Sequence, residues 1–180
     1  TGIMYGWYSY YMYNDYKFNN NLIRDCFSKA TTYFVNDNYG DKKQFNNNRI
    51  SNNITSDGNT GFSYVMYLFY PSMSFTSECN NNVIDSNTFG YYGYLMYQYY
   101  WNGTVNGNKL TNNRIYNAST STMGYMYGLF QAYYYNLQMN NNLVANNIGY
   151  YGQYAFYNYS YNSGSYTLEC RQNTLKMDDA

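Results

Sequence analysis

The stretch Phe45-Asn46-Asn47-Asn48-Arg49-Ile50 decides the fold, because its pattern returns along the whole chain. The pattern is an apolar residue, an Asn three positions later, and an aliphatic residue two positions after that Asn. Copies begin at Phe18, Phe45, Cys79, Leu110, Met139 and Cys170, with separations of 27, 34, 31, 29 and 31 residues. A unit that recurs about every 30 residues is typical of a solenoid.

The composition favours strands over helices. The chain has 30 Tyr and 14 Gly, which favour strands and turns, whereas helical repeats need long stretches of Ala, Leu, Glu and Lys. Phe45 and Ile50 are an odd number of positions apart, so strict alternation would place them on opposite faces, and the chain must bend between them. We expect one all-β domain over residues 1–180, a parallel β-solenoid of about six coils of roughly 30 residues.

The recurring Asn has two properties that suit a bend. Asn tolerates the left-handed backbone conformation and forms hydrogen bonds with nearby backbone. Where the same Asn returns in every coil, its amide can also pair with the Asn above and below it, as in stacked cross-β chains. We predict a ladder made of Asn21, Asn48, Asn82, Asn113, Asn142 and Asn173.

Three Asn-rich segments, 46–53, 80–87 and 140–147, resemble the right-handed parallel β-helix repeat. This repeat occurs in pectate-lyase-like proteins and in many secreted or cell-surface microbial proteins. The resemblance covers all 180 residues and implies the fold. The repeat hosts many different functions, so it does not choose among them.

Charge excludes some partners and suggests a compartment. Ten basic and ten acidic residues cancel, and only 11% of residues are charged, so we expect no nucleic-acid partner. No apolar run approaches the ~20 residues that span a bilayer, so we expect no membrane insertion. A chain with few charges and many Tyr, Asn, Ser and Thr is expected to be extracellular or at a cell surface.

Four Asn-x-Ser/Thr sequences agree with that location, and they begin at Asn53, Asn102, Asn117 and Asn158. They are candidate N-glycosylation sites. An Asn-rich chain with many Ser and Thr also produces such sequences by chance, so a glycoprotein and an unmodified chain both remain open.

The three cysteines are predicted to be buried free thiols that act as small apolar residues. Cys79 and Cys170 occupy the same repeat position three coils apart, or ~14 Å at the strand spacing. That separation exceeds the ~7 Å Cα limit for a disulfide. Cys26 falls at another position of the repeat.

We expect no catalytic residue, metal site or cofactor. The chain has no His, the commonest general base. The enzymes that the repeat resembles cleave acidic polysaccharides with clustered Asp, whereas the acids here are scattered; a polysaccharide lyase or glycoside hydrolase stays an alternative. Asp37, Asn38 and Asp41 offer oxygen ligands for calcium, but Lys42 and Lys43 follow at once, so a solvated charged loop is expected there.

Runs of adjacent aromatic residues are the remaining functional candidate, because alternation forces some of them outward. The candidates are Tyr91, Tyr92, Tyr99, Tyr100, Trp101, Tyr133, Tyr134, Tyr135, Tyr159 and Tyr161. Outward Tyr rings supply contact area while their hydroxyls stay hydrogen-bonded. Such rings could pack subunits together, stack on sugar rings, or simply cover a β-sheet.

These observations favour a non-catalytic structural protein. We expect it to self-associate into a surface filament, sheath or stalk through its Tyr-rich faces and open β-helix ends. The repeat continues almost to both ends of the sequence, so the domain is expected to be uncapped, either as part of a longer chain of the same repeat or as a stacking subunit. The alternative is an adhesin or carbohydrate-binding β-helix, with glycans as partners.

Overall fold

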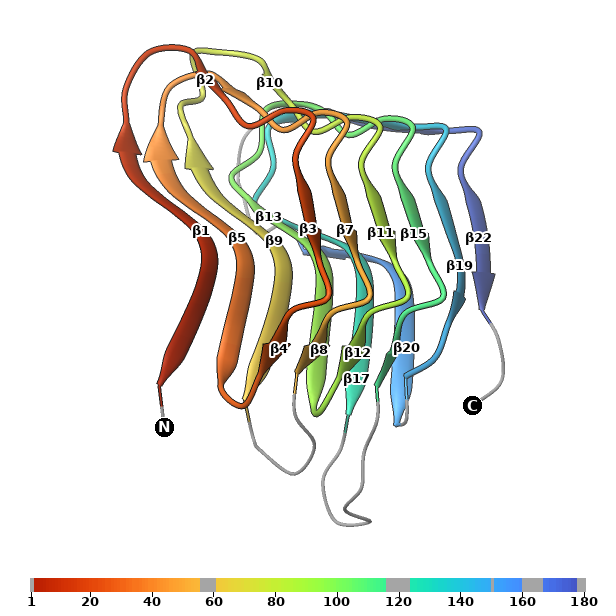
Figure 1. The fold of residues 1–180 in the computed structure, drawn as a ribbon. Helices are drawn as coiled ribbons and strands as arrows, with labels where there is room; N and C mark the ends of the chain where they lie inside the picture. Colours follow the sequence, from red (N-terminus) through yellow and green to blue (C-terminus); the bar gives the residue numbers. More distant parts are fainter. Residues whose placement is uncertain (1, 56–60, 116–123, 150, 160–166, 178–180) are drawn as a thin grey trace.

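The computed structural model describes residues 2–55, 61–115, 124–149, 151–159 and 167–177. These residues form an all-β parallel solenoid in which the coils stack from the N-terminal to the C-terminal side (Figure 1). Every strand pair is parallel, and each strand pairs with the equivalent strand of the next coil.

The strands form four sheets. The first sheet contains the longest strands: β1 Ile3–Met12, β5 Thr31–Gly40, β9 Phe62–Pro71, β13 Tyr92–Tyr99, β17 Tyr125–Ala132 and β20 Gly152–Tyr159. The second contains β2 Tyr16–Lys17, β6 Lys43–Gln44, β10 Ser77–Glu78, β14 Gly103–Thr104, β18 Asn136–Asn140 and β21 Thr167–Arg171. The third contains β3 Leu22–Arg24, β7 Arg49–Ser51, β11 Val83–Asp85, β15 Lys109–Thr111, β19 Leu143–Asn147 and β22 Thr174–Met177. The fourth contains β4 Phe27–Ser28, β8 Ile54–Thr55, β12 Thr88–Phe89 and β16 Arg114–Ile115.

Residues with positive φ make the corners between sheets. Between the second and third sheets they are Asn20, Asn47, Asn81, Gly107, Asn141 and Gln172, and between the third and fourth they are Asp25, Asn52, Ser86, Asn112 and Asn146. Asn, Asp and Gly adopt this conformation more readily than other residues. This preference explains why the Asn-rich part of each repeat makes two successive corners.

The residue after each of these corners is an Asn, except for Cys26 after Asp25, and these Asn side chains form two amide ladders. The first ladder contains Asn21, Asn48, Asn82, Asn108, Asn142 and Asn173. In each step the backbone N–H and the side-chain Nδ2 both donate to Oδ1 of the Asn in the next coil. A second ladder contains Asn53, Asn87, Asn113 and Asn147, and the Cys26 backbone N–H donates to it.

Asn113 therefore belongs to the second ladder, and its predicted place in the first ladder is wrong. Asn108 occupies that place instead. The pattern occurs twice in this coil, as Val105…Asn108…Leu110 and again from Leu110 through Asn113, so the sequence offers two registers. Pairing of Leu110 with Ile84 selects the first.

The core lies between the sheets, and Phe45, Ile50, Ile84 and Leu110 are among its fully buried apolar side chains. All three cysteines are free, but only Cys79 is buried; Cys26 is half-buried and Cys170 exposed. The prediction of three buried thiols is wrong for these two because they lie in the outermost coils, where the described chain covers only one side.

The segment after Val35 also differs from expectation. It is not a solvated loop, because β5 continues to Gly40 and the side chains of Asp37 and Lys43 are fully buried. Asp37 faces inward and pairs with Lys43, so its carboxylate does not join Asn38 and Asp41 as a calcium ligand.

Candidate functional site: a tyrosine face

The outward side chains of the first sheet form what we call the tyrosine face. Its central column contains Tyr5, Tyr33, Tyr64, Tyr94, Tyr127 and Tyr154, one from each coil. Successive ring centroids are 5.3, 4.7, 4.8, 4.7 and 4.9 Å apart, and the rings are tilted by 17° or less. The column follows from the fold, because in-register parallel strands repeat every ~4.8 Å, which places equivalent rings in stacking contact.

A second aromatic column runs beside the first. Tyr67, Tyr97, Phe130 and Tyr157 stack at 5.0, 4.6 and 4.9 Å. Its rings meet those of the first column edge to face; the Tyr64 and Tyr67 planes, for example, are inclined at 77°. The two columns therefore interlock into one aromatic layer.

The spacing of three between these columns breaks strand alternation. Tyr64 and Tyr67 both face outward because Val65 and Met66, which lie between them, are both fully buried. The strand bends at this pair of inward residues. The recurring aromatic-x-x-aromatic spacing, as in Tyr94…Tyr97, is a sequence signal for the face, and the predicted surface residues above do not include these two columns.

Stacking decides which part of each phenol is available. Inside a column both ring faces contact the rings of neighbouring coils, so the ring edges and hydroxyls are what the layer presents outward. Burial raises the pKa of Tyr94 to about 12, and neighbouring tyrosines, Tyr97 first, add to the increase. Burial likewise raises the pKa of Tyr97 to about 12. These two phenols therefore stay protonated and uncharged well above neutral pH.

The face also lacks charged side chains. Among the residues of its six strands, all of which the structure describes, Asp37 is the only charged one, and it is buried. The first sheet is thus a broad, neutral surface of phenols.

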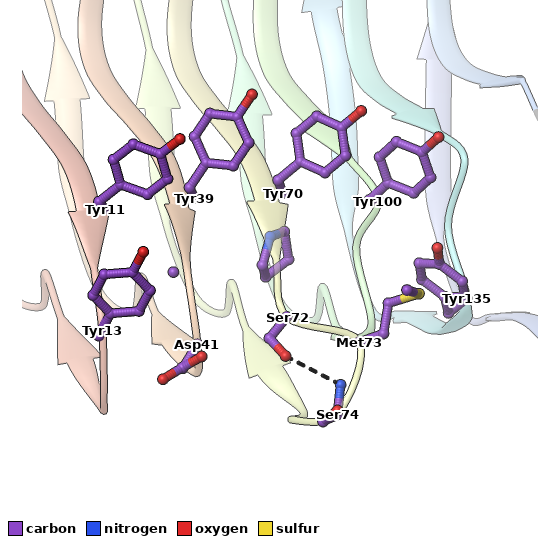
Figure 2. A pocket seen from close by; sticks show the side chains of 12 residues that line it. Tyr11, Tyr13, Tyr39, Asp41, Tyr70, Ser72, Met73, Ser74, Tyr100 and Tyr135 are labelled. Carbon is purple, nitrogen blue, oxygen red and sulfur yellow. Dashed lines mark hydrogen bonds between the residues drawn. The ribbon is translucent and has the colours of Figure 1, made fainter.

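A groove lies beside the face, where the first sheet turns toward the second (Figure 2). Tyr11, Tyr39, Tyr70 and Tyr100 stand in a row above it with their hydroxyls pointing the same way; each has positive φ. Tyr39 and Tyr70 stack at 5.2 Å and Tyr70 and Tyr100 at 4.5 Å. The groove has a volume of about 570 Å³, and Asp41, Ser72, Ser74 and Met73 also line it.

The predicted aromatic surface is divided by the structure. Tyr92 and Tyr99 lie on the tyrosine face. Tyr100 belongs to the row of tyrosines above the groove, and Tyr133 and Tyr135 stack on it at 5.3 and 6.0 Å. Tyr91 is half-buried and Tyr159 is exposed. Tyr161 lies outside the described residues. Trp101 and Tyr134 are buried, so their prediction as surface residues is wrong. Each follows a tyrosine with positive φ, Tyr100 or Tyr133, and this turn directs the next side chain inward.

The candidate glycosylation sites also differ from one another. Asn53 is fully buried in the second ladder, so its side chain is not accessible for glycosylation in the folded chain. Asn102 is half-buried and donates to the Met73 and Phe75 carbonyls. Asn158 is exposed and donates to the Tyr134 hydroxyl. Asn117 lies outside the described residues.

The acidic residues occupy separate surroundings. Asp85 accepts hydrogen bonds from Thr111 and Asn112, and Arg49 lies 4.0 Å away. Within the described ranges, no three His, Cys, Asp or Glu side chains come together as metal ligands. The same ranges contain no helix long and apolar enough to cross a membrane.

Comparisons with known proteins add no relative: no family model, curated protein or solved structure matches this chain.

Proposed function

We propose that this chain is a non-catalytic structural protein of the extracellular space or cell surface that self-associates into a filament, sheath or stalk. Its resemblance to the right-handed β-helix repeats of secreted and surface-exposed microbial proteins, pectate-lyase-like ones included, supports that location. The observation that carries the proposal is the tyrosine face.

The size of the face suits association between copies. Strands of eight to ten residues at ~3.3 Å per residue, in six rows ~4.8 Å apart, span roughly 30 by 24 Å, or about 700 Å². One partner in a standard protein interface contributes about 800 Å². Neutral aromatic patches of this extent are uncommon on monomeric proteins and mark interaction sites.

The chemistry of the face suits a second copy in particular. A protonated phenol both donates and accepts hydrogen bonds, so a surface of phenols is complementary to itself and can form a twofold interface. A face without charge neither attracts a charged partner nor repels its own copy. Open β-helix ends would add a second contact along the solenoid axis.

The stacking geometry favours self-association over sugar binding on the tyrosine face. Aromatic residues that hold sugars present a free ring face to the sugar, whereas rings inside the two columns, such as Tyr64 and Tyr94, already have both faces covered. Edges and hydroxyls remain, and these are suited to packing against another aromatic layer.

The test is sedimentation velocity combined with electron microscopy of the chain and of a charged variant. Tyr8→Glu with Tyr154→Glu places one charge near each end of the face, at side chains that are 50% and 40% exposed. We expect the parent to form dimers or larger assemblies and this variant to sediment as a monomer.

The matched control is Leu22→Glu with Ile54→Glu, which adds the same charges at exposed positions of the third and fourth sheets. This control should assemble like the parent. A parent that stays monomeric at every soluble concentration would refute self-association. If end contacts contribute, filaments should show an axial repeat of ~29 Å, the length of six coils.

The groove supports a second candidate, a carbohydrate-binding β-helix or adhesin. Its volume falls in the range of small-molecule sites, and it combines phenol hydroxyls with the Asp41 carboxylate, which accepts a hydrogen bond from the Asn14 backbone N–H at 3.0 Å. Calorimetric titration with cellohexaose, chitohexaose and polygalacturonate tests it. Binding that is lost in Asp41→Asn and kept in Asp15→Asn, whose residue lies outside the groove, would place the sugar there.

A further inference from the structure

A charged pair lies buried between the first and second sheets and has no part in the proposed function. The side chains of Asp37 in β5 and Lys43 in β6 have no exposed surface, and Lys43 Nζ lies 2.5 Å from Asp37 Oδ2. Residues from the neighbouring coils complete the site. The Ser9 hydroxyl donates to Asp37 Oδ1, and Lys43 Nζ donates to the Phe69 carbonyl at 3.1 Å.

Burial makes the ionised form of this pair costly, because two charges lose their water. It lowers the pKa of Lys43 despite the opposing effect of Asp37, which raises it. Transfer of one proton from Nζ to Oδ2 gives a neutral amine and a neutral carboxylic acid in contact. A neutral amine is a nucleophile, and the acid carbon, one C–O bond beyond Oδ2, lies within roughly 3.7 Å of Nζ.

The surroundings already fit the product of their condensation. A secondary amide between these side chains has one N–H and one carbonyl oxygen. The N–H would keep the Phe69 carbonyl as its acceptor, and the carbonyl oxygen, the former Oδ1, would keep the Ser9 hydroxyl as its donor. Every polar group of the amide would therefore be satisfied, and both buried charges would be gone.

We infer that Asp37 and Lys43 form an intramolecular isopeptide bond in the folded chain. Nζ attacks Cγ and the Nζ–Cγ bond forms. Two of the three ammonium protons pass to Oδ2, the Cγ–Oδ2 bond breaks, and Oδ2 leaves as water. No oxidant or cofactor takes part.

One neighbour, Ser9, has a positioning role. The Ser9 hydroxyl polarises the carbonyl that Nζ attacks, in the manner of an oxyanion-hole donor. Burial raises the pKa of Tyr16 in β2, and the charge of Asp37 raises it further. Its hydroxyl therefore stays protonated and adds no further charge to the buried site. The bond would fix the corner between β5 and β6 covalently.

The test is the intact mass of the purified full chain. The bond lowers the mass by about 18 Da, one water, relative to the sequence. Tandem mass spectrometry of a proteolytic digest should then recover one branched peptide that joins Asp37 to Lys43. A mass equal to that of the sequence would show an ordinary ion pair and overturn the inference.

Variants separate this bond from other losses of water, such as a succinimide at an Asp. Lys43→Arg should have its full sequence mass, whereas Lys42→Arg, the matched change one residue earlier, should keep the deficit. Asp37→Asn should lose about 17 Da, one ammonia, if the amide reacts in the same way. A deficit that persists in Lys43→Arg would contradict the bond. The branched peptide of the parent decides the question even if a variant does not fold.

Discussion

Replacing Asn82 by Ala should destabilise the solenoid more than any surface substitution, because Asn82 uses its whole amide inside the core. Its side chain has no exposed surface. Nδ2 donates to the Phe45 carbonyl at 2.7 Å and to Asn108 Oδ1 at 3.0 Å. Oδ1 accepts from the backbone N–H and from Nδ2 of Asn48, at 2.9 and 3.0 Å.

The size of the stability loss follows from the hydrogen bonds that the neighbours of Asn82 lose. Asn48 Nδ2 keeps the Phe18 carbonyl, and Asn108 Oδ1 keeps the Asn82 backbone N–H. The Asn48 backbone N–H loses its acceptor, Asn82 Oδ1, and the Phe45 carbonyl loses its donor, Asn82 Nδ2. An unsatisfied buried polar group costs about 1–3 kcal/mol. For these two groups together we expect a loss of about 3 kcal/mol in the free energy of unfolding.

Denaturant unfolding followed by circular dichroism measures this loss, and Asn21→Ala is the matched control. Asn21 stands in the same ladder, but its side chain only donates among the described residues, to Asn48 Oδ1 and the Asn19 carbonyl, and it is partly exposed. Its removal leaves no buried N–H without a partner, so we expect a loss below about 1 kcal/mol. Equal losses for the two variants would refute the account of the ladder.

Three further predictions concern the two tryptophans, the ionisation of Tyr94 and the backbone of Gly103. Trp101 is fully buried whereas Trp7 is 41% exposed. Iodide should therefore quench the fluorescence of Trp7 only, and the Trp7→Phe variant should show blue-shifted fluorescence from Trp101 that iodide does not quench. The Tyr94 pKa of about 12 exceeds the unfolded value of ~10, so the folded state holds more protons than the unfolded state between these pH values. The contribution of Tyr94 to the free energy of unfolding should be fully present below about pH 10 and should be lost as the pH rises toward 12. Denaturant titrations at several pH values measure this loss. Gly103 in β14 has φ of 139°, and an added Cβ would lie 1.9 Å from the Ser77 backbone oxygen. Gly103→Ala should therefore melt far below the parent in a thermal scan, and an unchanged melting temperature would contradict this close approach of the two strands.

The repeat was readable from the sequence because it depends on local chemistry. An apolar residue, a left-handed corner and an inward Asn recur at nearly constant spacing, and each feature follows from what one residue type does to its own backbone. Composition added that the repeats are strands. The β-solenoid, its coil length and five residues of the first ladder required nothing further.

The tertiary structure decided the register and the direction of those side chains for which the local sequence allows two equivalent alternatives. Leu110 could begin or end a copy of the pattern, and pairing with Ile84 in the neighbouring coil made the choice. Trp101 points inward because Tyr100 before it has positive φ, a conformation that no local rule assigns to a tyrosine. The tyrosine face needed Val65 and Met66 to turn inward together, against alternation.

The buried pair shows the same division most clearly. The sequence shows only that Asp37 and Lys43 lie six positions apart in a charged segment, which on its own indicates a solvated loop. The coils on either side bring Ser9 and Phe69 to the pair and exclude water from it. Local chemistry thus determined the repeat, while packing between coils determined which side chains face inward, because burial is a property of neighbours that are distant in sequence.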